Sequence, residues 1–255
     1  MRRLILRPGA IGDVIVSLPA LESLRTSYLE VWTSAATAPL IRFADRVRAI
    51  SSTGLDLLEL GLAPAELIDE LRGFDSIVSW YGSSRVDFRA AVEELSLPVT
   101  FFSALPPDGC GLHATDFYLE QVRELATCDP SPVPRINCNV AREHFAVMHP
   151  FSGSARKNWP IEKFSRMAAG ISRIMPVQWC AGPDDPPLPG AAQIADLYDL
   201  ACWLARASLY IGNDSGITHL AAAVGTPVLA IFRSTDPAVW APRGVVRFCM
   251  AKPKN

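Results

Sequence analysis

The stretch RPGAIGDVIVSLPAL, residues 7–21, connects a short apolar run to a segment of helical periodicity through a turn that contains two glycines. The run before it, RLILR at residues 3–7, has the length and composition of a buried strand. Apolar side chains then recur at helical spacing, at Leu18, Leu21, Leu24 and Tyr28. The stretch therefore predicts a strand, a tight turn and a helix, with Asp13 placed where the helix begins.

The same alternation continues through the first half of the chain. Further strands are expected at residues 29–33, 76–80 and 99–102. Helices are expected at residues 64–72, 84–95 and 114–126. Strands that alternate with helices in this way build a mostly parallel sheet with helices on both faces.

A stretch with three prolines, CDPSPVPRINCNVAR at residues 128–142, lacks both periodicities and resembles a linker. The alternation then resumes. Strands are expected at residues 144–150, 176–180, 209–213 and 227–232, and helices at 160–174, 196–206 and 215–224. We therefore predict an α/β protein with two parallel-sheet domains, at residues 1–135 and 136–255.

Composition limits the classes of function. A chain of 255 residues with 49% hydrophobic and 20% charged residues is long and apolar enough to bury a sizeable core. Its net charge of −2 argues against nucleic acid as a partner, which would require a basic surface. Six cysteines without a C-x-x-C pair favour reduced thiols over a zinc site. We expect a cytoplasmic protein, with peripheral contact to the inner face of a membrane left open.

A second informative stretch, residues 211–242, places small and polar side chains after a strand. Asp214 and Ser215 precede a helix, Gly216 allows close approach of a ligand to the backbone, and His219 lies one helical turn after Ser215. The amides that open such a helix suit a diphosphate. Each residue also has a simpler interpretation: Asp214 or Ser215 as a helix cap, and His219 as a buried core histidine.

The third stretch is HPFSGSARKNWPIEKF, residues 149–164. Small residues at Ser152 and Gly153 permit close backbone approach, and Lys157 precedes a helix that we expect to begin at Pro160. A lysine at this position supplies a point charge to phosphate oxygens. The alternative is a solvated lysine.

Together these three stretches resemble glycosyltransferase family 9, the ADP-heptose:lipopolysaccharide heptosyltransferases and their relatives. The chain matches R-x-G-x-[IL]-G-D-x-[IL]-x-[ST]-x-P-A-L at Arg7–Leu21, H-P-x-S-G-x-x-x-K-x-W-P at His149–Pro160, and N-D-S-G-x-x-H-L-A-A-A-x-G-x-P-V at Asn213–Val228. The resemblance implies a GT-B fold, in which two Rossmann-like domains with parallel sheets face each other across a cleft. The first domain would hold the acceptor and the second the nucleotide sugar.

The resemblance also implies a reaction. It is inverting, metal-independent transfer of a sugar, heptose from ADP-heptose, to a saccharide or glycolipid acceptor such as lipopolysaccharide core, with no cofactor. Asp13, with Gly12 on the acceptor side, would be the general base, whereas the simpler interpretation makes Asp13 a helix cap. Lys157 would neutralise the leaving diphosphate. The implied donor-binding residues are Ser152, Gly153, Lys157, Asp185 at the ribose, Ala195 beside adenine, Asp214, Ser215, Gly216 and His219.

Two features depart from the family pattern: the chain is shorter than typical members, and Arg233 replaces the usual glycine in F-G-x-T. The short chain motivates, as an alternative, a non-catalytic relative that binds a nucleotide sugar or acts as a scaffold. A third alternative, an NAD-dependent oxidoreductase, is disfavoured because the first turn reads Gly9-Ala10-Ile11-Gly12 and lacks G-x-G-x-x-G.

Overall fold

The computed structural model describes residues 1–251, which form two compact units. Unit 1 comprises Met1–Cys110 and Thr115–Ser131, and unit 2 comprises Gly111–Ala114 and the chain from Pro132 onward. We predicted the domain boundary after residue 135, and the units divide between Ser131 and Pro132. Residues 128–142 contain neither helix nor strand.

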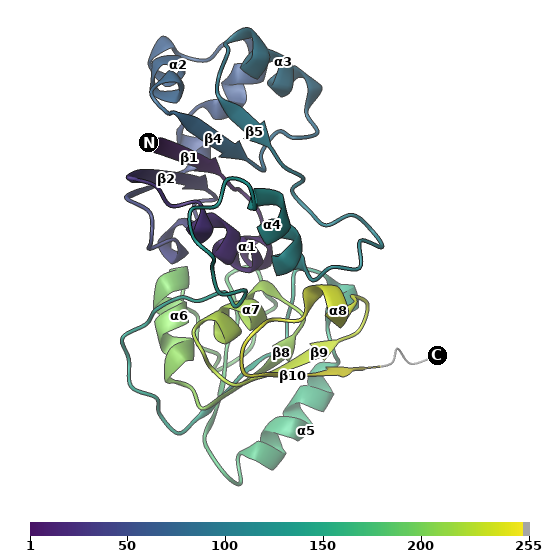
Figure 1. The fold of residues 1–255 in the computed structure, drawn as a ribbon. Coiled ribbons are helices and arrows are strands. Elements are labelled where there is room, and N and C mark those ends of the chain that lie inside the picture. Colours follow the sequence, from purple (N-terminus) through teal and green to yellow (C-terminus); the bar gives the residue numbers. More distant parts are fainter. Residues whose placement is uncertain (252–255) are drawn as a thin grey trace. The chain divides into compact units, whose positions relative to one another are not determined.

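Unit 1 is built on a five-stranded parallel sheet with the strand order β3-β2-β1-β4-β5 (Figure 1). Its strands are β1 (Arg2–Leu6), β2 (Tyr28–Thr33), β3 (Arg46–Ala49), β4 (Ser76–Ser79) and β5 (Val99–Phe101). Its helices are α1 (Ile11–Ser23), α2 (Ala65–Arg72), α3 (Val86–Glu94) and α4 (Ala114–Val122), with 3-10 turns at Ala38–Leu40, Ile50–Ser52 and Leu55–Leu60. Helices α1 and α4 cover one face of the sheet, and α2 and α3 cover the other (Figure 1).

The central strand β1 explains why this sheet forms. Leu4 and Ile5 are fully buried and point to opposite faces, so both faces of the strand need helical cover. On one face, Leu4 packs in a core cluster that includes Leu71 of α2 and Phe88 of α3. Burial on both faces accounts for the unbroken apolar run that identified the strand in the sequence.

Unit 2 repeats the architecture, with a five-stranded parallel sheet in the order β10-β9-β8-β6-β7. Its strands are β6 (Ala146–His149), β7 (Val177–Trp179), β8 (Leu209–Asn213), β9 (Val228–Phe232) and β10 (Val246–Met250). Its helices are α5 (Ile161–Ile171), α6 (Leu197–Arg206), α7 (Gly216–Ala223) and α8 (Pro237–Trp240), with a 3-10 turn at Ala155–Lys157. Helix α5 lies on one face and α6 and α7 on the other (Figure 1).

Several expected boundaries were wrong. Tyr28 does not belong to the first helix: α1 ends at Ser23, Leu24 is its C-cap, and Tyr28 begins β2. The helix expected to run to residue 126 ends at Val122. Pro160 is the N-cap of α5 rather than its first residue, and this helix ends at Ile171 rather than at residue 174.

Strands β3 and β10 were not predicted. The β3 sequence RVRA has no apolar run, and its arginines are held by carboxylates of other elements. Arg48 lies 2.7 Å from Glu70 of α2 and 3.9 Å from the buried Glu30 of β2, and Arg46 lies 3.6 and 3.7 Å from the same two residues. These ion pairs let a charged segment serve as an edge strand.

None of the helices within residues 1–251 combines the length and the apolar composition needed to cross a bilayer.

Candidate functional site

The turn after β1 places Asp13 in the first turn of α1, where its side chain is half-buried. Ala10 is the N-cap of this helix and makes no side-chain capping hydrogen bond. Asp13 is the third residue of the helix and not its N-cap. Gly12, the second residue of α1, is also half-buried.

Arg7 fixes the geometry of this turn. The residue is 1% exposed, and its guanidinium donates three hydrogen bonds: Nε to Ser17 Oγ at 3.1 Å, Nη1 to the Pro8 carbonyl at 3.1 Å, and Nη2 to the Asp13 carbonyl at 2.9 Å. The guanidinium carbon also lies 4.8 Å from the centre of the Tyr118 ring. One side chain thus ties the end of β1 to the first two turns of α1.

The charges around this turn are coupled. Burial lowers the pKa of Arg7, and its attraction to Tyr118 and to Asp13 opposes that shift. Burial raises the pKa of Tyr118 to about 12, so its hydroxyl stays protonated and donates to the Ala104 carbonyl at 2.8 Å. We gave Arg7 no role in the sequence, although it is the first residue of the motif that contains Asp13.

In unit 2, the predicted donor residues gather at the carboxyl edge of the sheet. The register pairs His149 with Gly212 and Asn213 with Ile231, so β6, β8 and β9 end side by side. The Asp214 amide donates to the Ile231 carbonyl at 3.0 Å and extends this alignment beyond the strands. The loops after these strands therefore lie where parallel α/β sheets bind their ligands.

The central feature of this edge is an ion pair between Lys157 and Asp214. Lys157 Nζ lies 2.7 Å from Asp214 Oδ2, and the Asp214 side chain is 5% exposed. Thr235 Oγ1, from the loop after β9, donates to the same carboxylate oxygen at 2.5 Å. The carboxylate thus orients the lysine ammonium and connects three loops.

Helix α7 begins beside this ion pair. Ser215 is its N-cap and accepts a hydrogen bond from the Thr218 amide at 3.3 Å, and Gly216 is its first residue. The cap role considered as an alternative is thus observed for Ser215 and not for Asp214. The helix N-terminus directs its dipole and its unpaired amides toward the loops of the sheet edge.

His219 lies one turn into α7 and is 5% exposed. Burial lowers its pKa to about 4; the charge of Asp214 opposes this shift, and the charges of His113 and Lys157 add to it. The imidazole is therefore neutral at pH 7. His113 comes from the short segment Gly111–Ala114 that belongs to unit 2, and its Nε2 lies 2.7 Å from the Ala241 carbonyl. No local signal in the sequence pointed to His113, because no motif surrounds it.

The loop that carries Lys157 is held by Asn213, to which we also gave no role. Asn213 Nδ2 donates to the Pro150 carbonyl at 2.6 Å, and its Oδ1 accepts from the Trp159 amide at 2.9 Å. Within the loop, Ser152 Oγ lies 2.7 Å from Asn158 Oδ1. Gly153 is exposed, and a Cβ atom at this position would meet no atom within 4 Å. Hydrogen bonds with Asn213 therefore hold the loop at Pro150 and at Trp159, and no other atoms fill the space next to Gly153.

Asp185 occupies the turn after β7. Its Oδ2 accepts from the Gly182 amide at 2.6 Å and lies 3.0 Å from Nε2 of the buried His149. The hydrogen bond from His149 is the main cause that lowers the pKa of Asp185. Ala195 lies exposed before α6, and in the described part of the chain we find no hydrogen bond from it to the other predicted residues.

The structure thus assembles two sets of predicted residues, each within its own unit. Asp13 and Gly12 lie in unit 1, beside Arg7. In unit 2, Lys157 pairs with Asp214, Asn213 holds the loop that carries Lys157, and Asp185 pairs with His149, whereas Ala195 takes no part in these contacts.

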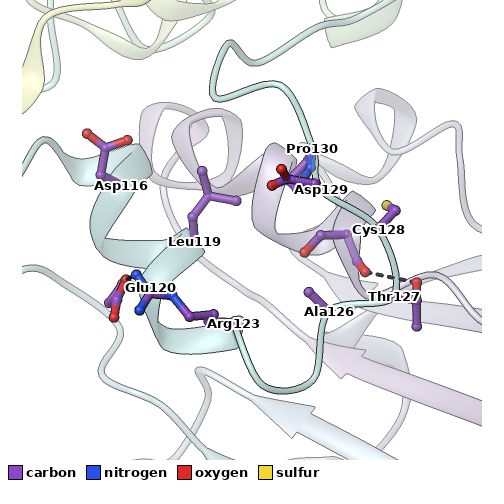
Figure 2. Close-up of a pocket in the computed structure, with 10 residues that line it drawn as sticks. Asp116, Leu119, Glu120, Arg123, Ala126, Thr127, Cys128, Asp129 and Pro130 are labelled. Atoms are coloured by element: carbon purple, nitrogen blue, oxygen red, sulfur yellow. Dashed lines mark hydrogen bonds and ion pairs between the residues drawn. The ribbon is translucent and has the colours of Figure 1, made fainter.

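A cavity of about 640 Å³ in unit 1 contains none of these residues (Figure 2). It lies between α4 and the segment that follows this helix, and its lining combines charged and small side chains. Arg123 there is paired with Glu120, and the Thr127 hydroxyl donates to the Ser23 carbonyl at 3.1 Å. The cavity therefore lies apart from the predicted acceptor-side turn.

Comparison with known proteins links this chain to one family. The family model described as glycosyltransferase family 9 (heptosyltransferase) matches residues 99–252, more than half of the chain. Lipopolysaccharide heptosyltransferase 3 of Escherichia coli K12 is 30% identical over 148 residues, which cover 51% of this chain and 43% of that protein. The match thus spans less than half the length of the curated relative.

Solved structures agree in fold. A glycosyltransferase family 9 protein from Veillonella parvula superposes with a TM-score of 0.75 at 18% identity, covering 98% of this chain and 86% of the other. The Escherichia coli heptosyltransferase WaaC, solved with ADP, superposes with a TM-score of 0.72 at 17% identity, covering 98% and 93%. These similarities confirm the expected fold class, an α/β protein of the GT-B type with two parallel sheets.

Proposed function

Since the chain belongs to glycosyltransferase family 9, we propose that it is an inverting, metal-independent glycosyltransferase that acts on a nucleotide-sugar donor. The proposed reaction moves heptose from ADP-heptose to a saccharide or glycolipid acceptor such as lipopolysaccharide core. Two of the structural relatives support the donor, since they are heptosyltransferase WaaC with ADP and with ADP-2-deoxy-2-fluoro heptose. The curated relatives, which are lipopolysaccharide heptosyltransferases, support the acceptor.

The observation that carries this proposal is the Lys157–Asp214 ion pair beside the N-terminus of α7. A lysine held by a buried carboxylate is ordered before the ligand arrives, so little side-chain entropy is lost on binding. The helix N-terminus supplies amide donors and a favourable dipole for the same anion. This combination suits a diphosphate without requiring a metal ion.

In the proposed reaction, the Asp13 carboxylate accepts the proton of the acceptor hydroxyl. The acceptor oxygen then attacks the anomeric carbon on the face opposite the nucleoside diphosphate, so the configuration of that carbon inverts. The bond to the diphosphate breaks, and its electron pair remains on the departing phosphate oxygen. Lys157 and the α7 amides stabilise the negative charge that develops there.

The proposal also assigns a location. A nucleotide-sugar donor places the reaction in the cytoplasm, and a glycolipid acceptor would bring the protein into peripheral contact with the inner face of the membrane.

The first test is calorimetric titration with ADP, UDP and GDP in the presence of EDTA. We expect selective binding of ADP to the wild type and a weakening of about tenfold or more in Lys157→Ala, because a charge-assisted contact is lost. The matched control is Lys163→Ala, a lysine on α5 that lies over Trp159 at 5.5 Å. Absence of nucleotide binding, or binding only with added metal, would contradict the proposal.

The second test separates an enzyme from a relative that only binds the donor. Purified protein is supplied with ADP-heptose and a heptose-deficient lipopolysaccharide core, and release of ADP is followed together with the mass of the acceptor. We expect ADP release and a gain of one heptose per acceptor. Donor binding without any transfer would instead support the non-catalytic alternative.

A further inference from the structure

Arg233 is the first residue after β9 and lies in the same group of loops as the Lys157–Asp214 pair. Its Nη1 donates to the Asn158 carbonyl at 2.5 Å. Asn158 directly follows Lys157 and is the C-cap of the 3-10 turn Ala155–Lys157. Arg233 thus holds the backbone next to the lysine that we assign to the diphosphate.

The loop after β9 reaches both members of the ion pair. Arg233 contacts the turn that carries Lys157, and Thr235, two residues later, donates to the Asp214 carboxylate. Since β8 and β9 are neighbours in the sheet, this loop and the start of α7 emerge from adjacent strand ends. Because Arg233 directly follows β9, the pairing of β8 with β9 places its backbone beside the loop that carries Asp214.

The charges of this group show why a second cation matters. The carboxylate of Asp214 balances the ammonium of Lys157 within the ion pair. His219 adds no charge at pH 7, because burial lowers its pKa to about 4. Without Arg233, the side chains joined by these contacts would have no net positive charge to offer a diphosphate. Arg233 supplies the excess charge, and the α7 dipole acts in the same direction.

We propose that Arg233 is a second cation of the diphosphate subsite, which fixes the Lys157 turn through the Asn158 carbonyl and binds phosphate oxygens of the nucleoside diphosphate beside Lys157. The identity of this ligand rests on the proposed function. A guanidinium suits both tasks because it presents five N–H donors in a rigid plane, and the bond to Asn158 uses one of them.

The test compares ligands with and without the diphosphate. ADP and adenosine are titrated calorimetrically, in EDTA, into wild type, Arg233→Gln and Arg233→Lys. We expect Arg233→Gln to raise the Kd of ADP about tenfold or more and to leave the Kd of adenosine unchanged, since adenosine has no phosphate. Arg233→Lys should recover part of the ADP affinity, because it keeps the charge and loses the planar geometry. Arg166→Gln, at an exposed position on α5, is the control and should match wild type for both ligands.

Three outcomes would overturn the proposal. Equal weakening of ADP and adenosine in Arg233→Gln would show that the residue only supports the fold of the loop. Unchanged ADP affinity would show that it does not bind the diphosphate. A wild type that binds neither ligand would contradict the proposed function and this proposal together. The first two outcomes would contradict this proposal alone.

Discussion

Lys157 Nζ and Asp214 Oδ2 lie 2.7 Å apart and join the loop after β6 to the loop after β8. The carboxylate orients the lysine and at the same time opposes the binding of an anion. An anionic ligand must therefore compete with Asp214 for the same ammonium. This competition makes the aspartate a residue whose removal should affect binding and turnover in opposite directions.

We predict that Asp214→Asn binds ADP more tightly and transfers sugar more slowly. Loss of one negative charge beside the diphosphate should lower the Kd of ADP about threefold to tenfold. Turnover should fall about tenfold or more, because Lys157 loses the partner that fixes its ammonium. Calorimetry with ADP and a steady-state transfer assay measure the two effects separately.

Thr235→Val is the control for this experiment. It removes the hydroxyl that donates to the Asp214 carboxylate and leaves every charge in place. The Kd of ADP should stay within about threefold of wild type, as for the loss of one neutral hydrogen bond. Weaker ADP binding in Asp214→Asn would contradict the competition and show that the carboxylate supports the bound nucleotide.

Replacement of Asp13 by asparagine tests the assignment of the base. The amide cannot accept the acceptor proton at neutral pH, so turnover should fall about a hundredfold or more. Nucleotide binding should be unchanged, since Asp13 belongs to unit 1 and the donor residues belong to unit 2. Transfer kinetics and ADP titration on the same preparation provide both readouts.

The matched control is Asp87→Asn, which removes another acidic side chain from the first turn of a helix in the same unit. Asp87→Asn removes a negative charge from a helix N-terminus, as Asp13→Asn does, and should leave transfer unchanged. If both variants lost activity alike, the loss in Asp13→Asn would reflect helix stability, and the base would have to be sought elsewhere.

His219 gives the folding stability a specific dependence on pH. Its pKa is lowered by burial to about 4 from an ordinary value of 6.5, so the unfolded chain takes up a proton that the folded chain rejects. The free energy of unfolding should therefore decrease as the pH falls from 6.5 to 4, by roughly 3 kcal/mol in total. Urea unfolding at several pH values within this window measures the decrease.

His219→Gln should flatten this dependence, because glutamine does not titrate. Asp185 acts in a lower window: its pKa is lowered from 3.8, so its stabilising contribution is present above 3.8 and is lost as the pH falls below it. A slope between pH 6.5 and 4 that was the same in wild type and His219→Gln would show that other groups cause the dependence.

The central strands of both sheets and one edge strand of each, β5 and β7, could be predicted from the sequence, whereas the opposite edge strands β3 and β10 could not. Strand β1 was evident because both of its faces are buried, which produces an uninterrupted apolar run. Strand β3 is stabilised by ion pairs with Glu30 and Glu70, which lie elsewhere in the chain. Strand β10, VRFCM, is apolar in sequence but mostly exposed, and it joins the sheet by pairing with β9 alone. Local periodicity does not encode such tertiary contacts.

A similar limit applies to the candidate site. Lys157 and Asp214 were each predicted from their own motif, but the sequence did not show that they form an ion pair. Arg7 is in a motif and was missed, because its role consists of hydrogen bonds within a turn rather than of chemistry. His113 was missed because it joins unit 2 from a distant segment.

The fold of unit 1 also depends on one glycine beside its core. Gly82 has a φ of +70°, and a Cβ atom there would lie 2.3 Å from Cδ1 of the buried Phe88. We predict that Gly82→Ala lowers the free energy of unfolding by about 2–4 kcal/mol, which combines a left-handed backbone with overpacking of the core. Gly61→Ala is the control, because Gly61 has a φ of +67° and open space around it, so only the backbone penalty of about 1 kcal/mol should remain. Equal losses in urea unfolding of the two variants would show that Phe88 moves aside without cost.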